Sequence, residues 1–318
     1  MEIQLDILQS LGVAIIAYML GVFIKKKVMF FQKFFIPSPV IGGLIISIIN
    51  LILKQNGLGF FKFDDIIQDF FMNIFFTCIG LACSFKVLKK SGWLGIKLAI
   101  AIILLLPLQN ILAVGLAKAM GINPLHGVAM GSTSMTGGIG SAVSFGKIME
   151  GYGATNNTSI GVAAATFGML IGSLVGGPVA KRLIRVHNLK STGAQIANIK
   201  EKNTNQINQK NLMDAIVVIA LASFLGTFIN KLLAFTNLNF PYYVGCQFGG
   251  LITRNIYDLL KKDSHIDNIE VLGNISLNLF LSLALINLNI SAMLGLALPM
   301  FVIMIAQAIF IAIYTSLV

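Results

Sequence analysis

The stretch that decides the fold is His126-Gly-Val-Ala-Met-Gly-Ser-Thr-Ser-Met-Thr-Gly-Gly-Ile-Gly-Ser-Ala-Val-Ser-Phe-Gly-Lys147. Six of its 22 residues are glycine and six are serine or threonine. Glycine weakens a helix by about 1 kcal/mol per residue relative to alanine, so one continuous helix is not expected here. The stretch nevertheless carries no formal charge before Lys147, which is unlike an aqueous loop. A re-entrant hairpin, which enters a membrane and returns to the same side, satisfies both features if protein or a water-filled cavity covers its backbone.

The composition of the whole chain indicates a membrane protein. Charged residues make up 11% of the 318 residues, hydrophobic residues make up 56%, and the mean hydropathy is +0.86. Soluble globular proteins carry about 25% charged residues, so this chain has too few charges to cover a soluble surface. The net charge of +11 comes from short clusters between apolar runs, which are typical of loops beside a membrane. We therefore expect contact with membrane lipid and no nucleic-acid partner.

The apolar runs predict about nine transmembrane helices, because a helix needs about 20 apolar residues to span the hydrocarbon core. The predicted spans are 5–24, 36–53, 69–85, 94–117, 157–179, 213–233, 241–260, 271–290 and 292–315. The acidic N-terminus is unlike a signal peptide, so the first run is expected to remain as a span.

The distribution of basic residues predicts the orientation. With the N-terminus outside and the 126–147 stretch not crossing the membrane, 18 of the 23 lysines and arginines fall inside and five fall outside. Positive loops favour the cytoplasmic side, so this split supports an outside N-terminus. The five predicted outside are Lys54, Lys62, Lys118, Lys147 and Lys231.

The two halves of the chain resemble each other weakly. Met72–Thr77 parallels Leu277–Ser282 at an offset of 205 residues, and Gly42–Ile45 parallels Gly249–Ile252 at an offset of 207. Because five spans per half is an odd number, the second copy must be inverted across the membrane. Inverted repeats are the architecture of secondary transporters, in which the substrate site lies at the repeat interface near the middle of the membrane.

This repeat divides the chain into three parts. Residues 1–185 form the first repeat, 186–211 form a polar linker rich in Asn, Gln and Lys, and 212–318 form the second repeat. The second repeat ends after the partner of the fourth span, so we expect it to lack its own re-entrant hairpin and last span. The predicted fold is an all-α membrane protein with an incomplete inverted repeat.

Four stretches resemble the bacterial sodium/glutamate symporter family. They are Ile36-Pro-Ser-Pro-Val-Ile-Gly-Gly-Leu44, Gly131–Ala142, Ala165-Thr-Phe-Gly168 through Gly176-Gly-Pro-Val-Ala180, and Val271-Leu-Gly-Asn-Ile-Ser-Leu-Asn-Leu-Phe-Leu281. The resemblance runs along the whole chain. It implies ten spans in two inverted halves, each with a glycine-rich re-entrant loop. The family usually carries histidine where Ile139 stands here, a departure that bears on substrate preference.

The same resemblance implies a function. We expect Na⁺-coupled import of L-glutamate across the bacterial inner membrane by alternating access, in which a bundle carrying 126–147 moves against the rest. The chain is then a transporter and no enzyme. Na⁺ is the coupling ion, its ligands are unknown, and no other cofactor is expected. A homodimer is left open.

The predicted spans contain no mid-membrane charge that could pair with glutamate or Na⁺. A carboxylate must then meet backbone N–H groups and hydroxyls, and Na⁺ must meet neutral oxygens. The 126–147 stretch supplies both, since glycine lets backbone approach a ligand closely. The alternative is a tight packing turn. The residues predicted to line the path are Ser132, Thr133, Ser134, Thr136, Gly137, Gly138 and Gly140.

Two polar pairs occupy equivalent places in the repeats, namely Asn73 with Thr77 and Asn278 with Ser282. The i, i+4 spacing puts each amide and hydroxyl on one helix face. A polar side chain inside a span is either functional or joins helices by hydrogen bonds. Their symmetry favours a place on the substrate or ion path. Gln109 and Asn110 in the fourth span present the same choice without clear symmetry.

Three other functional classes fit less well. Gly140 to Gly146 has one residue too many for a phosphate-binding loop, and no H-E-x-x-H motif or mid-span aspartate pair points to an intramembrane enzyme. A channel also uses glycine-rich re-entrant loops and stays open as an alternative. So does a symporter of another small organic anion.

Overall fold

The structure is a computed structural model that describes residues 2–34, 36–186, 208–236, 238–261 and 265–317. Most of the predicted linker at 186–211 lies outside the described residues. The helices, in chain order, are α1 (Ile7–Lys27), α2 (Met29–Lys33), α3 (Ser38–Gln55), α4 (Ile66–Ala82), α5 (Phe85–Ala119), α6 (Pro124–Met130), α7 (Ser132–Met135), α8 (Gly138–Gly151), α9 (Asn157–Val186), α10 (Gln209–Ala234), α11 (Tyr242–Leu259), α12 (Ile266–Ile286), α13 (Ile290–Leu294) and α14 (Ala297–Leu317). Two short strands, β1 (Glu2–Gln4) and β2 (Phe60–Lys62), pair in parallel with Ile3 opposite Phe61.

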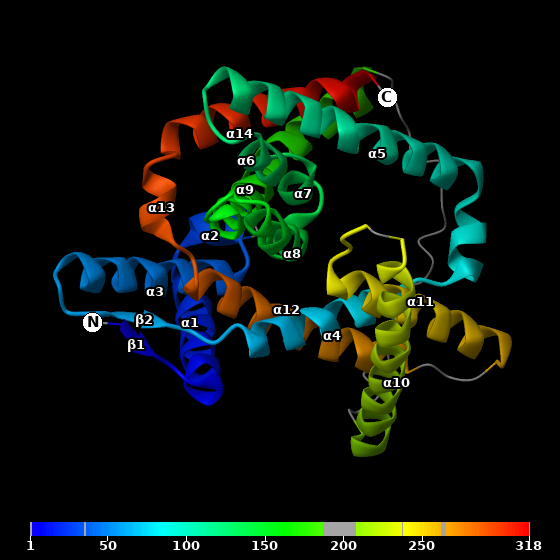
Figure 1. The fold of residues 1–318 in the computed structure, drawn as a ribbon. Coiled ribbons are helices and arrows are strands. Elements are labelled where there is room, and N and C mark those ends of the chain that lie inside the picture. Colours follow the sequence, from blue (N-terminus) through cyan, green and yellow to red (C-terminus); the bar gives the residue numbers. More distant parts are fainter. Residues whose placement is uncertain (1, 35, 187–207, 237, 262–264, 318) are drawn as a thin grey trace. The chain divides into compact units, whose positions relative to one another are not determined.

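Each predicted span overlaps one of these helices, which confirms an all-α membrane protein (Figure 1). Within the described ranges, seven helices are long and apolar enough to cross a membrane: α1, α3, α5, α9, α10, α12 and α14. Helix α4 is apolar but only 17 residues long. Helix α11 has 18 residues but carries Gln247, Arg254 and Asp258, and it is not among the seven. The count of nine spans stays a prediction.

The ends of the first helices follow from local sequence. The Asp6 carboxylate accepts from the Gln9 N–H at 2.7 Å, and the Gln9 side chain accepts from the Asp6 N–H at 3.0 Å. This reciprocal cap starts α1. Lys25, Lys26 and Lys27 lie in its last turn, where cations complement the helix dipole. Helix α3 begins with Pro39 in its first turn, where proline costs no hydrogen bond.

The described chain packs into two compact units. Unit 1 contains Met1–Met72, Trp93–Val175 and Ser276–Val318, and unit 2 contains Asn73–Gly92 and Gly176–Ile275. Both units draw on both predicted repeats, because helices α4 and α12 each contribute residues to both units. Between its two parts, α5 is interrupted at Gly92, whose φ of 57° is not helical.

Each unit contains a pair of helices that cross at glycines. In unit 1, a Cβ added at Gly42 of α3 would lie 3.1 Å from the Gly21 nitrogen of α1. In unit 2, a Cβ added at Gly249 of α11 would lie 2.7 Å from the Gly226 nitrogen of α10. Any larger side chain would separate these backbones, so the glycines are what permits the close crossings.

A third helix packs on each pair at a second glycine. Gly43 of α3 lies against Leu285 of α12 in unit 1, where an added Cβ would be 2.5 Å from the leucine Cβ. Gly250 of α11 lies against α4 in unit 2, where an added Cβ would be 2.9 Å from the Leu81 nitrogen. The third helix therefore comes from the other half of the sequence in both units.

A buried apolar cluster of unit 1 surrounds the glycine-rich stretch. Ala129 and Met130 of α6 are fully buried against Ala113 and Ala117 of α5, Ile160 and Ala164 of α9, and Ile303 of α14. Figure 1 shows α6, α7 and α8 gathered beside α9. The stretch is thus covered by protein, as irregular backbone in a membrane requires.

Candidate functional site

The glycine-rich stretch 126–147 does not form one continuous helix, as expected from its composition. Gly131, with φ −90° and ψ −138°, separates α6 from α7, and Thr136 and Gly137 separate α7 from α8, which begins at Gly138. Gly138 has a φ of 75°, a backbone conformation that favours glycine. The Asn123 side chain caps α6 by accepting from the Leu125 N–H at 3.0 Å. Three short helices therefore replace one, and their breaks leave backbone groups without helical partners.

A buried contact fixes the start of this stretch on α9. His126 Nδ1 lies 2.8 Å from Asn157 Oδ1, and Asn157 Nδ2 donates to the Leu125 carbonyl at 3.3 Å. Both side chains are buried. His126 is therefore a structural residue here, bonded to a neutral amide.

Five residues from three helices meet at the break between α6 and α8. Asn110 Oδ1 accepts from the Ser132 N–H at 2.9 Å, and Gln109 Oε1 accepts from the Thr136 hydroxyl at 2.6 Å. Gln307 Nε2 of α14 donates to the Gln109 carbonyl at 2.7 Å. We call these five residues the Gln109 cluster: Gln109, Asn110, Ser132, Thr136 and Gln307.

The Gln109 cluster contains a buried oxygen without a hydrogen-bond partner in the described part of the chain, Gln307 Oε1. The Gln307 side chain is 0% exposed. An unsatisfied buried polar atom costs about 1–3 kcal/mol, so it calls for an explanation such as a bound ion or water.

Two of the predicted hydroxyls hold the stretch together. The Thr133 hydroxyl donates to the Val128 carbonyl at 2.7 Å. Ser134 Oγ lies 2.8 Å from the Gly161 carbonyl of α9 and also contacts the Ala129 carbonyl. Their protons are committed to backbone, so only their oxygen lone pairs are available to a ligand.

The predicted glycines differ in what constrains them. A Cβ added at Gly137 would lie 2.6 Å from the Thr133 carbonyl, so space is limiting there. At Gly138 the space is open and the positive φ is limiting. Gly140 is buried in the first turn of α8. On α9, neighbouring segments pack closely against Gly161 and Gly168. A Cβ added at Gly172 would meet no described atom within 4 Å.

The two polar pairs of α4 and α12 behave differently. In unit 2 the Thr77 hydroxyl donates to the Asn73 carbonyl at 2.8 Å and lies 3.0 Å from Ser223 Oγ of α10. Thr77 therefore joins helices. Asn73 Oδ1 in unit 2 and Ser282 Oγ in unit 1 are buried and have no partner among the described residues. Asn278 of unit 1 is half-buried and does have a partner. Because the pairs belong to different units, each is described by itself.

Gln307 is the residue that sequence reasoning missed. For Gln109 and Asn110, the sequence leaves a functional role and a helix-joining role open. The signal was present, because an amide inside an apolar span needs a partner or a function. Its partner lies 198 positions away, which periodicity along one helix does not reveal.

An ion pair lies at the far end of α8. Lys147 Nζ contacts Asp69 of α4 at 2.7 and 3.0 Å. Both side chains are more than a third exposed, so the ion pair contributes little to the stability of the fold. Its main effect is to orient α8 relative to the first turn of α4. In the described residues no group of three or more His, Cys, Asp or Glu side chains could hold a metal ion.

Comparison with known proteins gives a consistent result. Residues 3–318 match the family model described as sodium/glutamate symporter. The chain is 34% identical over 323 residues to the sodium/glutamate symporter of Escherichia coli (strain K12), with 99% of this chain and 80% of that protein covered. It is 32% identical over 317 residues to the protein of the same name from Haemophilus influenzae, with 96% and 78% covered. No solved structure matches the chain.

Proposed function

The chain belongs to the sodium/glutamate symporter family, and from this we propose that its Gln109 cluster lines the path of glutamate and Na⁺. The chain is a multi-pass membrane transporter that couples glutamate import to Na⁺, and it is not an enzyme. We propose four further features of the transporter: the residues that line its path, its inverted repeat, its orientation and its mechanism.

The observation that carries the proposal is the broken helix backed by uncharged polar groups. Glutamate carries two carboxylates and an ammonium group, and no lysine, arginine, aspartate or glutamate belongs to the Gln109 cluster. Backbone N–H groups in the first turn of α8, which begins at Gly138, are therefore the proposed donors to a carboxylate, because the Ser132 N–H at the other break already donates to Asn110. The Ser132 hydroxyl adds a donor, whereas the Thr136 hydroxyl already donates to Gln109 Oε1.

The buried oxygens without partners among the described residues of unit 1 are Thr158 Oγ1, Ser282 Oγ and Gln307 Oε1, and the last two are the proposed Na⁺ ligands. Neutral carbonyl and hydroxyl oxygens are the ligands by which broken-helix transporters hold Na⁺. A bound ion would remove the cost of leaving each oxygen unsatisfied. The remaining predicted residues, Thr133, Ser134, Gly137 and Gly140, shape the backbone around this path.

An inverted repeat is supported by the reciprocal glycine contacts. Gly21 corresponds to Gly226 at the offset of 205, and Gly42 corresponds to Gly249 at the offset of 207. Leu285, which packs on Gly43, is 205 positions from Gly80 of α4, the helix that packs on Gly250. Equivalent positions thus make equivalent contacts in the two units, as two copies of one motif would.

The proposed orientation, with the N-terminus outside, is supported by which segments meet. In unit 1 the segments predicted outside lie together: β1 pairs with β2, and Asn289 Nδ2 donates to Asn156 Oδ1 at 3.0 Å. In unit 2 the segments predicted inside lie together: the Ser84 hydroxyl donates to Asp258 at 2.5 Å, and Asn255 accepts from the Phe85 N–H at 2.9 Å. We propose the bacterial inner membrane as the location.

The proposed mechanism is alternating access, in which the 126–147 stretch moves relative to the rest of the transporter with Na⁺ and glutamate bound. The exposed apolar side chains of α1 and α5, such as Ile16, Phe23, Ile103 and Ile111, are proposed to face lipid. Assembly as a homodimer is part of the proposal and is tested by cross-linking in the membrane.

The test of the function is uptake of labelled L-glutamate into proteoliposomes, with and without an inward Na⁺ gradient. Saturable accumulation that requires the gradient supports the proposal. A conductance that does not saturate would instead indicate a channel. Na⁺-driven uptake of other organic anions but not of glutamate would overturn the substrate assignment.

A further inference from the structure

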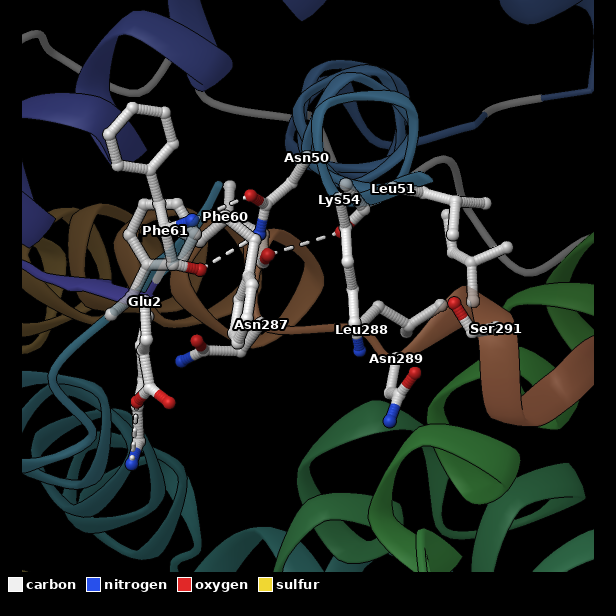
Figure 2. A pocket seen from close by; sticks show the side chains of 15 residues that line it. Glu2, Asn50, Leu51, Lys54, Phe60, Phe61, Asn287, Leu288, Asn289 and Ser291 are labelled. Carbon is white, nitrogen blue, oxygen red and sulfur yellow. Dashed lines mark hydrogen bonds and ion pairs between the residues drawn. The ribbon is translucent and has the colours of Figure 1, made fainter. Parts of the chain in front are cut away.

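Unit 1 contains a cavity whose lining residues include no member of the Gln109 cluster. It has a volume of about 300 Å³ and lies between the end of α3, strand β2 and the connection from α12 to α13 (Figure 2). Ligand pockets in proteins start at about this size. Its charged lining residues are Glu2, Lys54 and Lys62, and its neutral polar lining residues are Ser47, Asn50, Asn287, Asn289 and Ser291. We call it the Lys54 pocket.

The walls of the Lys54 pocket are fixed by hydrogen bonds to backbone. Asn50 of α3 exchanges two hydrogen bonds with the backbone of Phe61, both at 2.8 Å, which Figure 2 shows as dashed lines. The Ser47 hydroxyl lies within 3.1 Å of the Ile286 carbonyl and 2.5 Å of the Leu285 carbonyl. These bonds attach β2 and the end of α12 to the same helix. A ligand would therefore meet a preformed site and would not have to order it.

The charge of the Lys54 pocket is positive. Lys62 Nζ is paired with Glu2 at 3.3 Å. Lys54 has no acidic partner within ion-pair distance among the described residues, and its ammonium lies 5.0 Å from the centre of the Phe60 ring. Figure 2 shows Lys54 reaching from α3 toward Leu288 and Asn289. Two lysines and one glutamate leave one uncompensated positive charge on the lining, which favours an anion and disfavours a cation.

The other lining groups suit a carboxylate. A carboxylate accepts hydrogen bonds from ammonium, hydroxyl and amide donors, and the pocket presents Lys54 with the exposed Ser291 hydroxyl. Asp65 does not line the pocket, and its carboxylate accepts from Asn287 Nδ2 at 2.9 Å.

We propose that the Lys54 pocket binds a small carboxylate anion and holds external glutamate on the outer face before it reaches the transport path. The proposal rests on the proposed function for its orientation and for the identity of the anion. All lining segments, namely residue 2, residues 47–63 and residues 286–291, belong to the parts of the chain that the positive-inside pattern predicts at or near the outer face. A fixed positive pocket beside the path raises the local concentration of an anionic substrate.

The proposal is tested by protection of a cysteine placed in the pocket. Ser291→Cys is made with Cys83→Ser, since Cys83 is the exposed native cysteine, and is reconstituted in phosphatidylcholine vesicles. A membrane-impermeant thiol reagent is added outside, with or without L-glutamate or glutarate. We expect both anions to slow labelling several-fold. The same protection is expected with Gly138→Leu, which is designed to block transport, because the pocket binds independently of turnover.

Matched lysine variants identify the charge. Lys54→Gln should abolish protection and raise the KM for external glutamate several-fold without changing kcat. Lys54→Arg should retain protection. Lys118→Gln removes a lysine that is also exposed and predicted outside, and it should change neither.

Four results would overturn the proposal: labelling unaffected by glutamate, protection that is lost with Gly138→Leu, protection that survives Lys54→Gln, and protection that disappears when phosphatidylglycerol replaces phosphatidylcholine. The last result would make a lipid headgroup the occupant. Wild-type uptake in the same vesicles separates the two hypotheses. Protection without Na⁺-driven uptake would support the anion pocket and contradict the proposed function. Uptake without protection would support the proposed function and contradict the anion pocket.

Discussion

Among single residues, Gln307 combines complete burial, a contact to the glycine-rich stretch through Gln109, and an oxygen with no partner in the described chain. Only one of its two polar atoms is satisfied by protein. The amide nitrogen is bonded, so the oxygen is the atom that can coordinate a cation. In a Na⁺-coupled transporter, Na⁺ is the cation available to it.

Replacing Gln307 by leucine is expected to impair Na⁺ coupling. Leu fills a similar volume and removes both the Gln109 contact and the unpartnered oxygen, so membrane insertion should be retained. We expect the Na⁺ concentration for half-maximal uptake to rise about tenfold or more, equivalent to about 1.4 kcal/mol. Uptake against external Na⁺ measures it.

Thr315→Val on the same helix is the control, because the Thr315 hydroxyl donates within α14 to Ile311 at 2.8 Å. It should leave the Na⁺ dependence unchanged. Wild-type Na⁺ dependence in Gln307→Leu would exclude Gln307 from the ion path.

Gly131 controls the position of Asn110. An added Cβ at Gly131 would collide with Asn110 Oδ1, the atom that accepts from the Ser132 N–H. Gly131→Ala is therefore expected to displace Asn110 and to lower uptake at least tenfold. Gly115→Ala on α5, where an added Cβ meets no described atom within 4 Å, should have wild-type uptake. Equal uptake by the two variants would show that the Asn110 contact is dispensable.

Among the elements, the break between α7 and α8 is the one whose geometry depends on a single backbone angle. Gly138 has open space around it and a φ of 75°, so the shape of the break depends on tolerance of positive φ and not on room for a side chain. Non-glycine residues in such conformations cost about 1–3 kcal/mol, and asparagine is tolerated better than most.

Substitutions at Gly138 are expected to follow this backbone preference. Uptake should fall in the order Gly, Asn, Ala, Leu, with Leu abolishing transport, while the amount of protein in the membrane stays unchanged. Uptake is measured per inserted molecule. Gly172→Ala, in an ordinary helical position with open space, is the control. An Ala variant more active than the Asn variant would contradict the strained-backbone explanation.

On the scale of the whole molecule, the two units are built by the same contacts made by different residues. The α1–α3 and α10–α11 crossings each depend on glycines at corresponding positions, offset by 205 and 207 residues, and each receives a third helix from the opposite half. Neither sequence half is therefore complete as a packing unit.

This equivalence predicts matched losses of stability. Gly42→Ala and Gly249→Ala should each lower the thermal unfolding temperature in detergent by a similar amount, because each added methyl meets the backbone of the neighbouring helix. Overpacking of this kind costs about 1–3 kcal/mol. Gly12→Ala, where an added Cβ meets no described atom within 4 Å, should have no such effect. A loss at only one of the two sites would argue against equivalent repeats.

Several features could be predicted from the sequence because their causes are local. The apolar runs around 5–24 or 213–233 must be helical in a membrane, since every backbone group there needs an internal partner. The glycine content of 126–147 disfavours one continuous helix, and the breaks fall at Gly131 and Gly137. The resemblance of stretches such as Ile36–Leu44 to a known family was equally independent of packing, and the family match confirms it.

Other features depend on which helices lie together, and only the tertiary structure decided them. The sequence predicts that the Thr133 and Ser134 hydroxyls line the path, and in the structure both donate to backbone carbonyls. Gln307 and Gln109 meet across 198 positions, and the Lys54 pocket joins residues from Glu2 to Ser291. Hydrogen bonds act over about 3 Å, so their partners depend on which helices cross. Hydropathy and glycine content are local properties of the chain and can be evaluated without knowing which helices cross. The sequence by itself therefore determined the apolar helices and the absence of one continuous helix over 126–147, and the fold determined which polar atoms remain available to a ligand.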